Sequence, residues 1–374
     1  MKVFYLITKS ETGGPQTHIS QLGKYLVDRG DQLALMSYPG GWQRGGWLEK
    51  EIEKMGGCFY PNEYLSNDIN PIKDFLAIRK IRKAIKEFKP NVVSCHSSKA
   101  GVLGRIAIRN RIPTVFTAHG WGFTQGTSWE RKFLIPLEKF SSKYCSKIIC
   151  VSDNDRNLAL KHKIAPADKI ITIHNGVEID NNFVFDEDKY RNLPIKIVNV
   201  GRFAPPKRQI WLLQAFMKLP DDLKKRAKIV FIGDGITKKE TVSFIKSNHL
   251  EDKTEFTGDI LRDGVFKTLS ECHIFALISE WEGFPRTIIE AMIFGLPIIS
   301  SDVGGARESV LKENGFLIPS NDIKEISVAL EKLISNSDLM IQMGKASRKL
   351  AEDKFSLATM IEKTVGIYEA IKKP

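Results

Sequence analysis

Short apolar segments alternate with longer amphipathic segments along most of this 374-residue chain. The apolar segments are rich in Val, Ile and Phe, which is typical of strands that are buried on both faces of a parallel sheet. The amphipathic segments repeat apolar residues at helical spacing. The alternation therefore predicts an α/β fold. Its predicted strands fall into two sets, 2–8, 32–37, 91–96, 113–118 and 147–151, and then 195–200, 228–232, 254–257, 273–278 and 297–300.

The two sets of strands predict two Rossmann-like domains. Residues 1–185 form the predicted N-terminal domain and residues 186–355 the predicted C-terminal domain, with the linker between His174 and Arg191. A chain of 374 residues is longer than one hydrophobic core usually organises, and its hydrophobic fraction of 42% is that of a globular protein. Ligands of open parallel sheets bind beyond the carboxyl ends of the strands, so candidate chemistry is expected there.

The segment from Ser279 to Met292 carries the most specific chemistry, with Glu282 and Glu290 on either side of a seven-residue gap. It follows the predicted strand at 273–278, and Pro285 suits the first turn of a helix. First-turn amides would offer N–H groups and the positive end of a helix dipole to a diphosphate. Glutamates beside such a site accept hydrogen bonds from sugar and ribose hydroxyls. The alternative is two ordinary glutamates that flank a helix.

A second loop of this kind follows the predicted strand at 195–200, where Gly201 is followed by Arg202 and Lys207. A guanidinium and an ammonium leaving the same strand end could neutralise a pyrophosphate as it departs. The alternative is a solvated basic loop. Two phosphate-type loops in one half of the chain favour the nucleotide interpretation over that alternative.

Two further motifs end predicted strands in the first half of the chain. Gly13 and Gly14 precede a helix, where a backbone without side chains permits close approach of a ligand. His119 follows the strand at 113–118 and stands next to Gly120. By themselves, a glycine pair marks a turn and a single histidine is usually a packed or surface residue.

Taken in order, Gly13-Gly14, Thr117-Ala118-His119-Gly120, Gly201 to Lys207 and Ser279 to Met292 resemble the motifs of the retaining glycosyltransferases of family four, over Lys2 to about Leu357. The resemblance implies the GT-B architecture, an α/β fold of two facing Rossmann-like domains with parallel sheets and an interdomain cleft. It also implies that a last helix, at about 356–374, packs back on the first domain. The opening residues 3–17 and the His119-Gly120-Trp121 turn are most similar to bacterial transferases that build O-antigen or capsule repeat units on a lipid carrier.

The resemblance implies a hexosyl transfer from a nucleotide-diphosphate sugar, with uridine as the commonest base, to a glycan on a polyprenyl-diphosphate carrier. His119 and Glu282 would be catalytic, with His119 near the donor sugar. The implied donor-binding residues are Gly13, Gly14, Arg202, Lys207, Gly283, Phe284, Pro285, Arg286, Thr287 and Glu290. No carboxylate near His119 can be placed as a nucleophile. We therefore expect same-face substitution, in which the departing diphosphate helps to deprotonate the acceptor.

Transferases that hold a diphosphate through a divalent ion generally use an Asp-x-Asp motif, and this chain contains two such sequences. Asp153-Asn154-Asp155 follows Ser152 and is typical of a capped helix start, whereas Asp186-Glu187-Asp188 lies in the predicted linker. Both are interpreted as structural. The enzyme is therefore expected to use no metal and no cofactor beyond its nucleotide-sugar co-substrate.

Charge is distributed unevenly. Residues 1–185 contain 27 Lys and Arg against 17 Asp and Glu, which is +10 of the total charge of +12. Pro71 to Arg111 holds 11 basic and 2 acidic residues, many on a helical pattern with an apolar face. This segment could contact an anionic membrane peripherally, or its apolar face could be core. The predicted acceptor contacts are Trp42 and Trp47, in a glycine-rich loop, and Trp121.

Other classes of protein are less consistent with the sequence. No apolar segment reaches the ~18 residues of a membrane span, and the first strand is too short for a signal-peptide core. The five cysteines include no Cys-x-x-Cys pair and are expected to be buried in a reducing cytosol. We expect a cytoplasmic location, with the inner face of the cell membrane as a further option. One alternative is a sugar-nucleotide epimerase of the same fold, but the acid and base residues that an epimerase needs are not evident in this sequence. The other is a nucleic-acid-binding protein, but the sequence contains no recognisable module of that kind.

Overall fold

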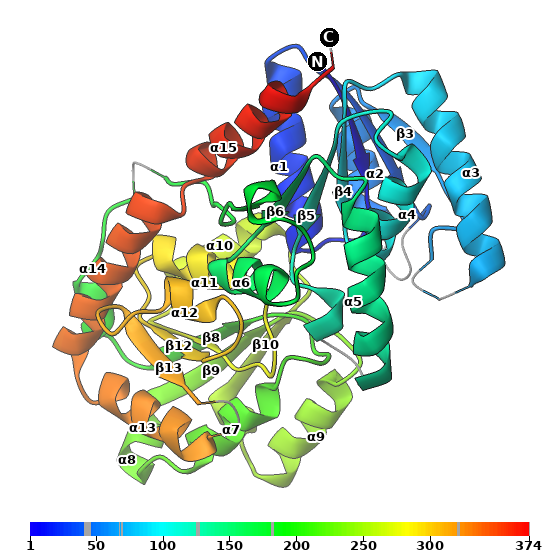
Figure 1. Cartoon of the computed structure of the whole chain (residues 1–374). Coiled ribbons are helices and arrows are strands. Elements are labelled where there is room, and N and C mark those ends of the chain that lie inside the picture. Colours follow the sequence, from blue (N-terminus) through cyan, green and yellow to red (C-terminus); the bar gives the residue numbers. More distant parts are fainter. Residues whose placement is uncertain are drawn as a thin grey trace. The chain divides into compact units, whose positions relative to one another are not determined.

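The structure, a computed structural model, describes residues 1–40, 46–66, 68, 70–124, 128–180, 183–319 and 322–373, with only the backbone of residues 128–131. The chain forms two compact units (Figure 1). The first comprises Met1–Asn175 together with Ala358–Pro374, and the second comprises Gly176–Leu357. Each unit has its own parallel sheet and its own hydrophobic core.

The first unit therefore ends ten residues before the boundary predicted from the sequence, at Asn175 instead of residue 185. Contacts within the second unit explain the difference. The Val177 amide donates to the Phe355 carbonyl at 2.9 Å, and the Phe185 ring stacks on Tyr190 with centroids 5.6 Å apart. Residues that the sequence assigned to the first domain thus pack with the second unit.

The sheet of the first unit has the order β3-β2-β1-β4-β5-β6-β7. All of its strand pairs are parallel, and β4 and β5 are buried over their whole length. Its strands are β1 Lys2–Leu6, β2 Gln32–Ser37, β3 Cys58–Pro61, β4 Val92–His96, β5 Thr114–Ala118, β6 Lys147–Cys150 and β7 Ile170–Thr172. Its helices are α1 Gly14–Asp28, α2 Trp47–Lys54, α3 Pro71–Phe88, α4 Ser98–Ile108, α5 Ser128–Ser142, α6 Asp153–Lys161 and α15 Leu357–Ile371, with short 3-10 helices at Gly122–Thr124 and Ala167–Lys169.

The sheet of the second unit has the order β10-β9-β8-β11-β12-β13 and is also parallel. Its strands are β8 Ile195–Val200, β9 Ala227–Ile232, β10 Thr254–Gly258, β11 Ile274–Leu277, β12 Ile298–Ser301 and β13 Gly315–Ile318. Its helices are α7 Gln209–Met217, α8 Asp221–Arg226, α9 Lys238–Ser247, α10 Arg262–Ser270, α11 Arg286–Ile293, α12 Ala306–Ser309, α13 Ile323–Ile334 and α14 Ser337–Lys354, with 3-10 helices at Asp188–Arg191 and Glu251–Lys253.

The strand order reverses direction at one point in each sheet, between β1 and β4 in the first unit and between β8 and β11 in the second. At such a switch point the loops that leave neighbouring strands turn to opposite faces of the sheet. Ligands of such sheets bind at the carboxyl ends of these two pairs of strands. The four motifs of the family resemblance follow β1, β8 and β11 at the switch points, and β5, which is the neighbour of β4.

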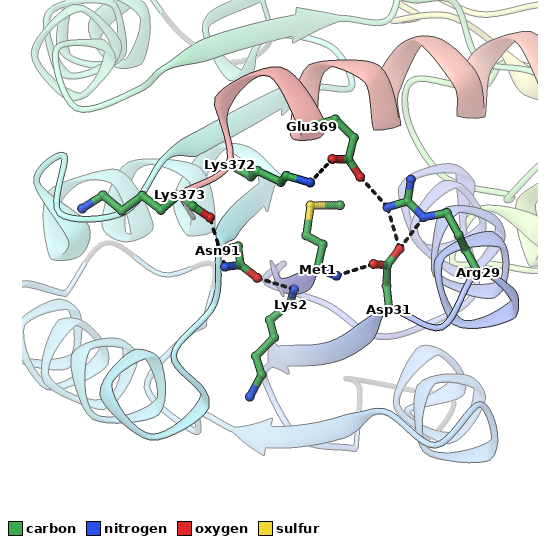
Figure 2. A network of polar contacts seen from close by, with 8 residues as sticks. All are labelled: Met1, Lys2, Arg29, Asp31, Asn91, Glu369, Lys372 and Lys373. Carbon is green, nitrogen blue, oxygen red and sulfur yellow. Dashed lines mark hydrogen bonds and ion pairs between the residues drawn. The ribbon is translucent and has the colours of Figure 1, made fainter.

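Polar contacts fix the C-terminal helix α15 to the first unit (Figure 2). Arg29 pairs with Glu369 at 2.8 Å and donates from Nε to Asp31 at 2.7 Å, and Asp31 also accepts a hydrogen bond from the amino group of Met1. The side chain of Asn91 donates to the Lys373 carbonyl at 3.2 Å. Because both chain ends share this network, the return of the last helix to the first unit is tied to the start of the sheet.

Within the described residues, no helix is both long enough and apolar enough to cross a membrane. Four of the five cysteines, Cys95, Cys145, Cys150 and Cys272, are buried as expected. Cys58 is exposed, because it begins the edge strand β3. For this residue the expectation of burial was wrong.

Candidate functional site

Two loops meet at the switch point of the second unit. The loop after β8 contains Lys207 and the loop after β11 contains Glu282, and the Lys207 ammonium forms an ion pair with the Glu282 carboxylate. Both side chains are largely buried, with exposed fractions of 19% and 11%. Residues 75 positions apart in the sequence, which the motifs had assigned to one site, are thus in direct contact.

The same two loops are joined through their backbones. The Arg208 amide donates to the Ile278 carbonyl at 2.9 Å, and the Glu280 amide donates to the Pro206 carbonyl at 3.0 Å. An ion pair of 2.7 Å between Arg208 and Glu280 lies on the more exposed side of this connection. These bonds fix the backbone on both sides of Lys207, and the ion pair with Glu282 holds its ammonium.

A third loop, after β12, supports the backbone of Glu282. Gly304 has a φ of +55°, and a Cβ built on it would lie 1.8 Å from the Glu282 carbonyl oxygen. The next residue, Gly305, donates from its amide to the Gly283 carbonyl at 2.8 Å. Only glycine combines this left-handed backbone with so close an approach, so the sequence Gly304-Gly305 fixes where Glu282 can lie.

Helix α11 begins directly after the loop that follows β11, as the sequence predicted, with Pro285 as its N-cap residue. Arg286 is buried, and its burial lowers the pKa of its guanidinium to about 10, while the charge of Glu290 opposes that shift. The side chain thus remains cationic at neutral pH. Phe284 is buried against Phe355, with ring centroids 5.4 Å apart, so it holds the loop and offers little surface to a ligand.

Arg202 lies at the end of β8 with an exposed side chain. Among the described residues its guanidinium has no ion-pair partner, whereas Lys207 has Glu282. The Arg202 carbonyl accepts a hydrogen bond of 3.1 Å from the Gln209 side chain, which fixes the backbone while the side chain remains available. The described part of the second unit thus presents the cations of Arg202, Lys207 and Arg286 and the carboxylates of Glu282 and Glu290 around the start of α11. This set matches a diphosphate flanked by hydroxyl groups.

In the first unit, Gly13 is the N-cap residue of α1, and Gly14 is the first residue of that helix. The φ of Gly13 is 174°, which is extended backbone that any residue adopts. A Cβ at Gly13 would meet only the Gln16 side-chain oxygen, at 2.7 Å. The pair lies at a strand-to-helix turn as predicted, but backbone conformation does not require glycine at position 13.

His119 follows β5 and is half-buried. Its Nε2 atom lies 3.0 Å from Nδ1 of His96, which is the last residue of β4. The buried ring of His18, from α1, packs edge-on against His119 with centroids 5.1 Å apart. Burial, and then the charge of His18, hold the pKa of His96 well below its usual range, so the His96 ring is neutral. His119 therefore belongs to a group of three imidazoles drawn from three elements.

The three tryptophans predicted to contact an acceptor have different positions. Trp47 is half-buried at the start of α2, where the neighbouring Leu48 amide donates to the Ser10 carbonyl at 2.9 Å, so it lies beside the loop after β1. Trp121 is only 1% exposed, stacks on Phe123 and donates from Nε1 to the Asp155 carbonyl. Trp121 is thus a core residue, and its predicted contact with an acceptor was wrong. Trp42 lies outside the described residues.

The first Asp-x-Asp sequence begins a capped helix, as predicted, whereas the second lies within the second unit and not in a linker between the units. Ser152 caps α6 by accepting a hydrogen bond of 3.0 Å from the Asp155 amide, and Asp153 accepts one of 2.6 Å from the Thr172 hydroxyl. In the second sequence, Asp186 accepts hydrogen bonds from the Asp188 and Lys189 amides at the start of a 3-10 helix.

Sequence reasoning missed His96 and Gly304. His96 ends the strand at the switch point and His119 follows the strand beside it, so a second histidine at the carboxyl edge of the sheet was a usable signal. Gly304 carried a weaker signal, because a Gly-Gly pair after a strand is equally consistent with an ordinary turn.

Two family models match the chain in succession. Residues 12–181 match the family described as Glycosyltransferase Family 4, and residues 182–350 match Glycosyl transferases group 1. Together they cover residues 12–350, which is most of both units.

Two relatives from Escherichia coli are similar over most of their length. One, a UDP-Gal:alpha-D-GlcNAc-diphosphoundecaprenol alpha-1,3-galactosyltransferase, is 30% identical over 320 residues, which is 81% of this chain and 81% of the relative. The other, the O-antigen biosynthesis glycosyltransferase WbnH, is 26% identical over 95% of this chain and 97% of its own.

Among solved structures, the HepE protein of Anabaena in complex with UDP-glucose superimposes with a TM-score of 0.82, at 20% identity, over 99% of this chain and 100% of that one. With two parallel α/β sheets and this likeness, the fold is the two-domain α/β fold of the GT-B class.

Proposed function

We propose that this chain, which belongs to the family 4 glycosyltransferases, moves a hexose from a UDP-sugar to a lipid-carrier-linked glycan, with retention of anomeric configuration. The pathway would be the synthesis of a cell-surface polysaccharide such as an O-antigen or capsule. The single observation that carries the proposal is the contact between Lys207 and Glu282 at the switch point of the second unit.

The donor would bind at the carboxyl edge of the second unit. Lys207 and Arg202 would neutralise the diphosphate, the start of α11 would add its amide N–H groups, and Glu290 would accept hydrogen bonds from the ribose. A diphosphate that binds Lys207 would replace Glu282 as the ion-pair partner of the Lys207 ammonium. The Glu282 carboxylate is then released to accept a hydrogen bond from a sugar hydroxyl.

Retention would follow from same-face substitution. The imidazoles of His18 and His96 contact His119. An imidazole can donate to a sugar hydroxyl or stabilise the developing oxocarbenium charge, but it does not form the glycosyl ester of a double displacement. The departing diphosphate, held by Lys207 and Arg202, would accept the acceptor proton, and no step requires a metal ion.

The similarity to a relative named for an undecaprenol-diphosphate acceptor supports a lipid-linked acceptor for this chain. A family match of this kind also favours the transferase over the epimerase and nucleic-acid-binding alternatives, because both matched families are glycosyltransferases.

Thermal shifts in the presence of EDTA test donor binding. UDP, and one of a panel of UDP-sugars, are expected to raise the melting temperature by about 5 °C at ~100 times their dissociation constant, because a ligand at that level stabilises by ~2.7 kcal/mol. GDP and ADP compounds should give smaller shifts. A shift that appears only when a divalent metal is supplied would contradict metal-independent binding.

The UDP-sugar chosen by this panel is then incubated with a synthetic polyprenyl-diphosphate-linked monosaccharide. Release of UDP with a product that keeps the anomeric configuration of the donor, read from its proton coupling constant in NMR spectra, is the expected result. An inverted product would refute same-face substitution, and a donor that binds without turnover would refute this acceptor class.

A membrane contact through α3 would bring the enzyme to such an acceptor. The apolar face predicted for this helix comprises Ile72, Phe75, Leu76, Ile81, Ile85 and Phe88. Ile81 and Phe88 are core residues, which agrees in part with the core alternative, but Ile72 and Phe75 are 74% and 58% exposed. They lie one helical turn apart, and the exposed Lys73, Arg79 and Lys83 belong to the same helix. Apolar side chains beside cations are suited to an anionic bilayer surface.

Replacing both Ile72 and Phe75 by Gln is expected to weaken binding to vesicles that contain 30% phosphatidylglycerol by about tenfold or more, because two apolar side chains no longer insert. Co-sedimentation measures the bound fraction. The control is Val184→Gln, which removes an exposed apolar residue of the second unit. Equal binding of the α3 variant and the wild type would rule out this surface.

A further inference from the structure

A chain of buried polar groups runs from the C-terminal helix to His119. The Tyr368 hydroxyl, on α15, donates to Ser94 Oγ at 2.8 Å. Ser94 Oγ lies 3.0 Å from Nε2 of His96, and Nδ1 of His96 lies 3.0 Å from Nε2 of His119. Tyr368, Ser94 and His96 are all fully buried. The chain thus joins a candidate catalytic residue to the last helix of the protein.

The direction of donation along this chain follows from its hydrogens. Burial raises the pKa of Tyr368 to about 12, so the phenol keeps its proton and can donate to Ser94. Ser94 has a single hydrogen, and a buried hydroxyl without an acceptor is costly. Since Tyr368 supplies a hydrogen to Ser94, the hydrogen of Ser94 goes to Nε2 of His96. His96 then carries its own hydrogen on Nδ1, which donates to Nε2 of His119.

We propose that Tyr368, Ser94 and His96 form a relay that fixes His119 as its Nδ1–H tautomer, and that His96 and Tyr368 are positioning residues for the transfer. This inference rests on the proposed role of His119. With its Nε2 atom accepting from His96, the imidazole presents Nδ1–H as its donor. A sugar hydroxyl or ring oxygen would then meet a fixed N–H group instead of a ring that exchanges between two tautomers.

Neighbouring side chains hold the rings of the relay in position. The Tyr5 ring lies against His96 with centroids 5.8 Å apart, and His18 packs on both His96 and His119. At the other end, the contacts of Arg29 with Glu369 and of Asn91 with Lys373 hold α15 against the first unit (Figure 2). Glu369 is next to Tyr368 in the sequence, so its ion pair with Arg29 helps to hold Tyr368 in place. The return of the last helix therefore has a consequence for the site as well as for stability.

The test combines tautomer and turnover. In protein labelled with ¹⁵N-histidine, two-bond ¹H–¹⁵N spectra are expected to show His119 as the Nδ1–H form, with its signal assigned by its loss in His119→Gln. Tyr368→Phe and His96→Leu should both shift it toward the Nε2–H form. With the UDP-sugar that the protein turns over, kcat is expected to fall about tenfold in Tyr368→Phe and about a hundredfold in His96→Leu, with KM changed less than about twofold.

Two controls separate positioning from folding. His96→Asn places an amide N–H near the position of Nδ1 and should recover most of the lost kcat. Tyr190→Phe removes another buried tyrosine hydroxyl, one that donates to the Gly295 carbonyl in the second unit, and should leave kcat unchanged. An Nε2–H tautomer in the wild type, or an equal loss of kcat in Tyr190→Phe, would overturn the relay. The expected tautomer without turnover of any UDP-sugar would instead refute the proposed function and leave the relay standing.

Discussion

A Lys207→Met variant is expected to lose about three orders of magnitude in kcat/KM, with most of the loss in kcat. The Lys207 ammonium would face the diphosphate as negative charge develops on it, and one preorganised donor of this kind contributes about a hundred- to a thousandfold, or ~3–4 kcal/mol. Methionine keeps the length of the side chain, which packs along Gly201, so the change removes chiefly the charge. Steady-state kinetics with UDP-sugar and acceptor provide the measurement.

Arg208→Met is the matched control for this variant. Arg208 joins the same two loops through its ion pair with Glu280, but it lies on their more exposed side. Its loss is expected to change kcat/KM by less than about threefold, since exposed ion pairs contribute at most ~1 kcal/mol. If both variants lost activity equally, the effect would come from weaker contacts between the two loops and not from the loss of the Lys207 charge next to the diphosphate. A second variant, Lys207→Met combined with Glu282→Gln, shows whether an unpaired Glu282 carboxylate adds to the loss.

Nine of the ten predicted strands are apolar runs with buried residues along most of their length, such as β4 and β8. The tenth, the edge strand β10, has no buried residue and was predicted from the apolar and β-branched residues around Phe256. The strands β3, β7 and β13 were not predicted, and all three lie at the edges of their sheets. Edge strands are short and half-exposed here, with burial confined to a few positions, so they lack the apolar run that identifies a central strand. Their pairing is decided by the neighbouring strand and not by their own composition.

The candidate site was accessible to sequence reasoning where chemistry and local structure coincide. Lys207 and Glu282 each follow a recognisable strand, and the parallel sheet brings them together. Trp121 shows the limit of such reasoning. An indole next to a glycine is equally suited to a ligand and to a core, and only the packing of Phe123 and the acceptor at Asp155 decide between them. Tyr368 lies 274 residues from Ser94, and no local pattern indicates that contact.

Gly304→Ala is expected to lower kcat/KM by about a hundredfold although Gly304 is not among the proposed donor-binding residues. Its Cβ would lie 1.8 Å from the Glu282 carbonyl oxygen and 3.3 Å from that of Gly283, so the backbone of the loop after β11 must move. A displacement of ~1 Å in a positioning segment is enough for a loss of this size. The left-handed φ of +55° adds strain of about 1 kcal/mol, which lowers the melting temperature by ~2–4 °C. Thermal unfolding and UDP-sugar kinetics measure the two effects.

Gly56→Ala separates strain from displacement. Gly56 has a φ of +82°, but a Cβ built on it would meet nothing within 4 Å. This control should therefore lose a similar amount of stability while kcat/KM stays within about twofold of the wild type. If Gly304→Ala were destabilised yet fully active, Glu282 would tolerate a shifted backbone, and a direct role for its carboxylate in the transfer would be hard to maintain. A hundredfold loss that is confined to Gly304→Ala would instead show that the loop after β12 holds Glu282 in place for the reaction.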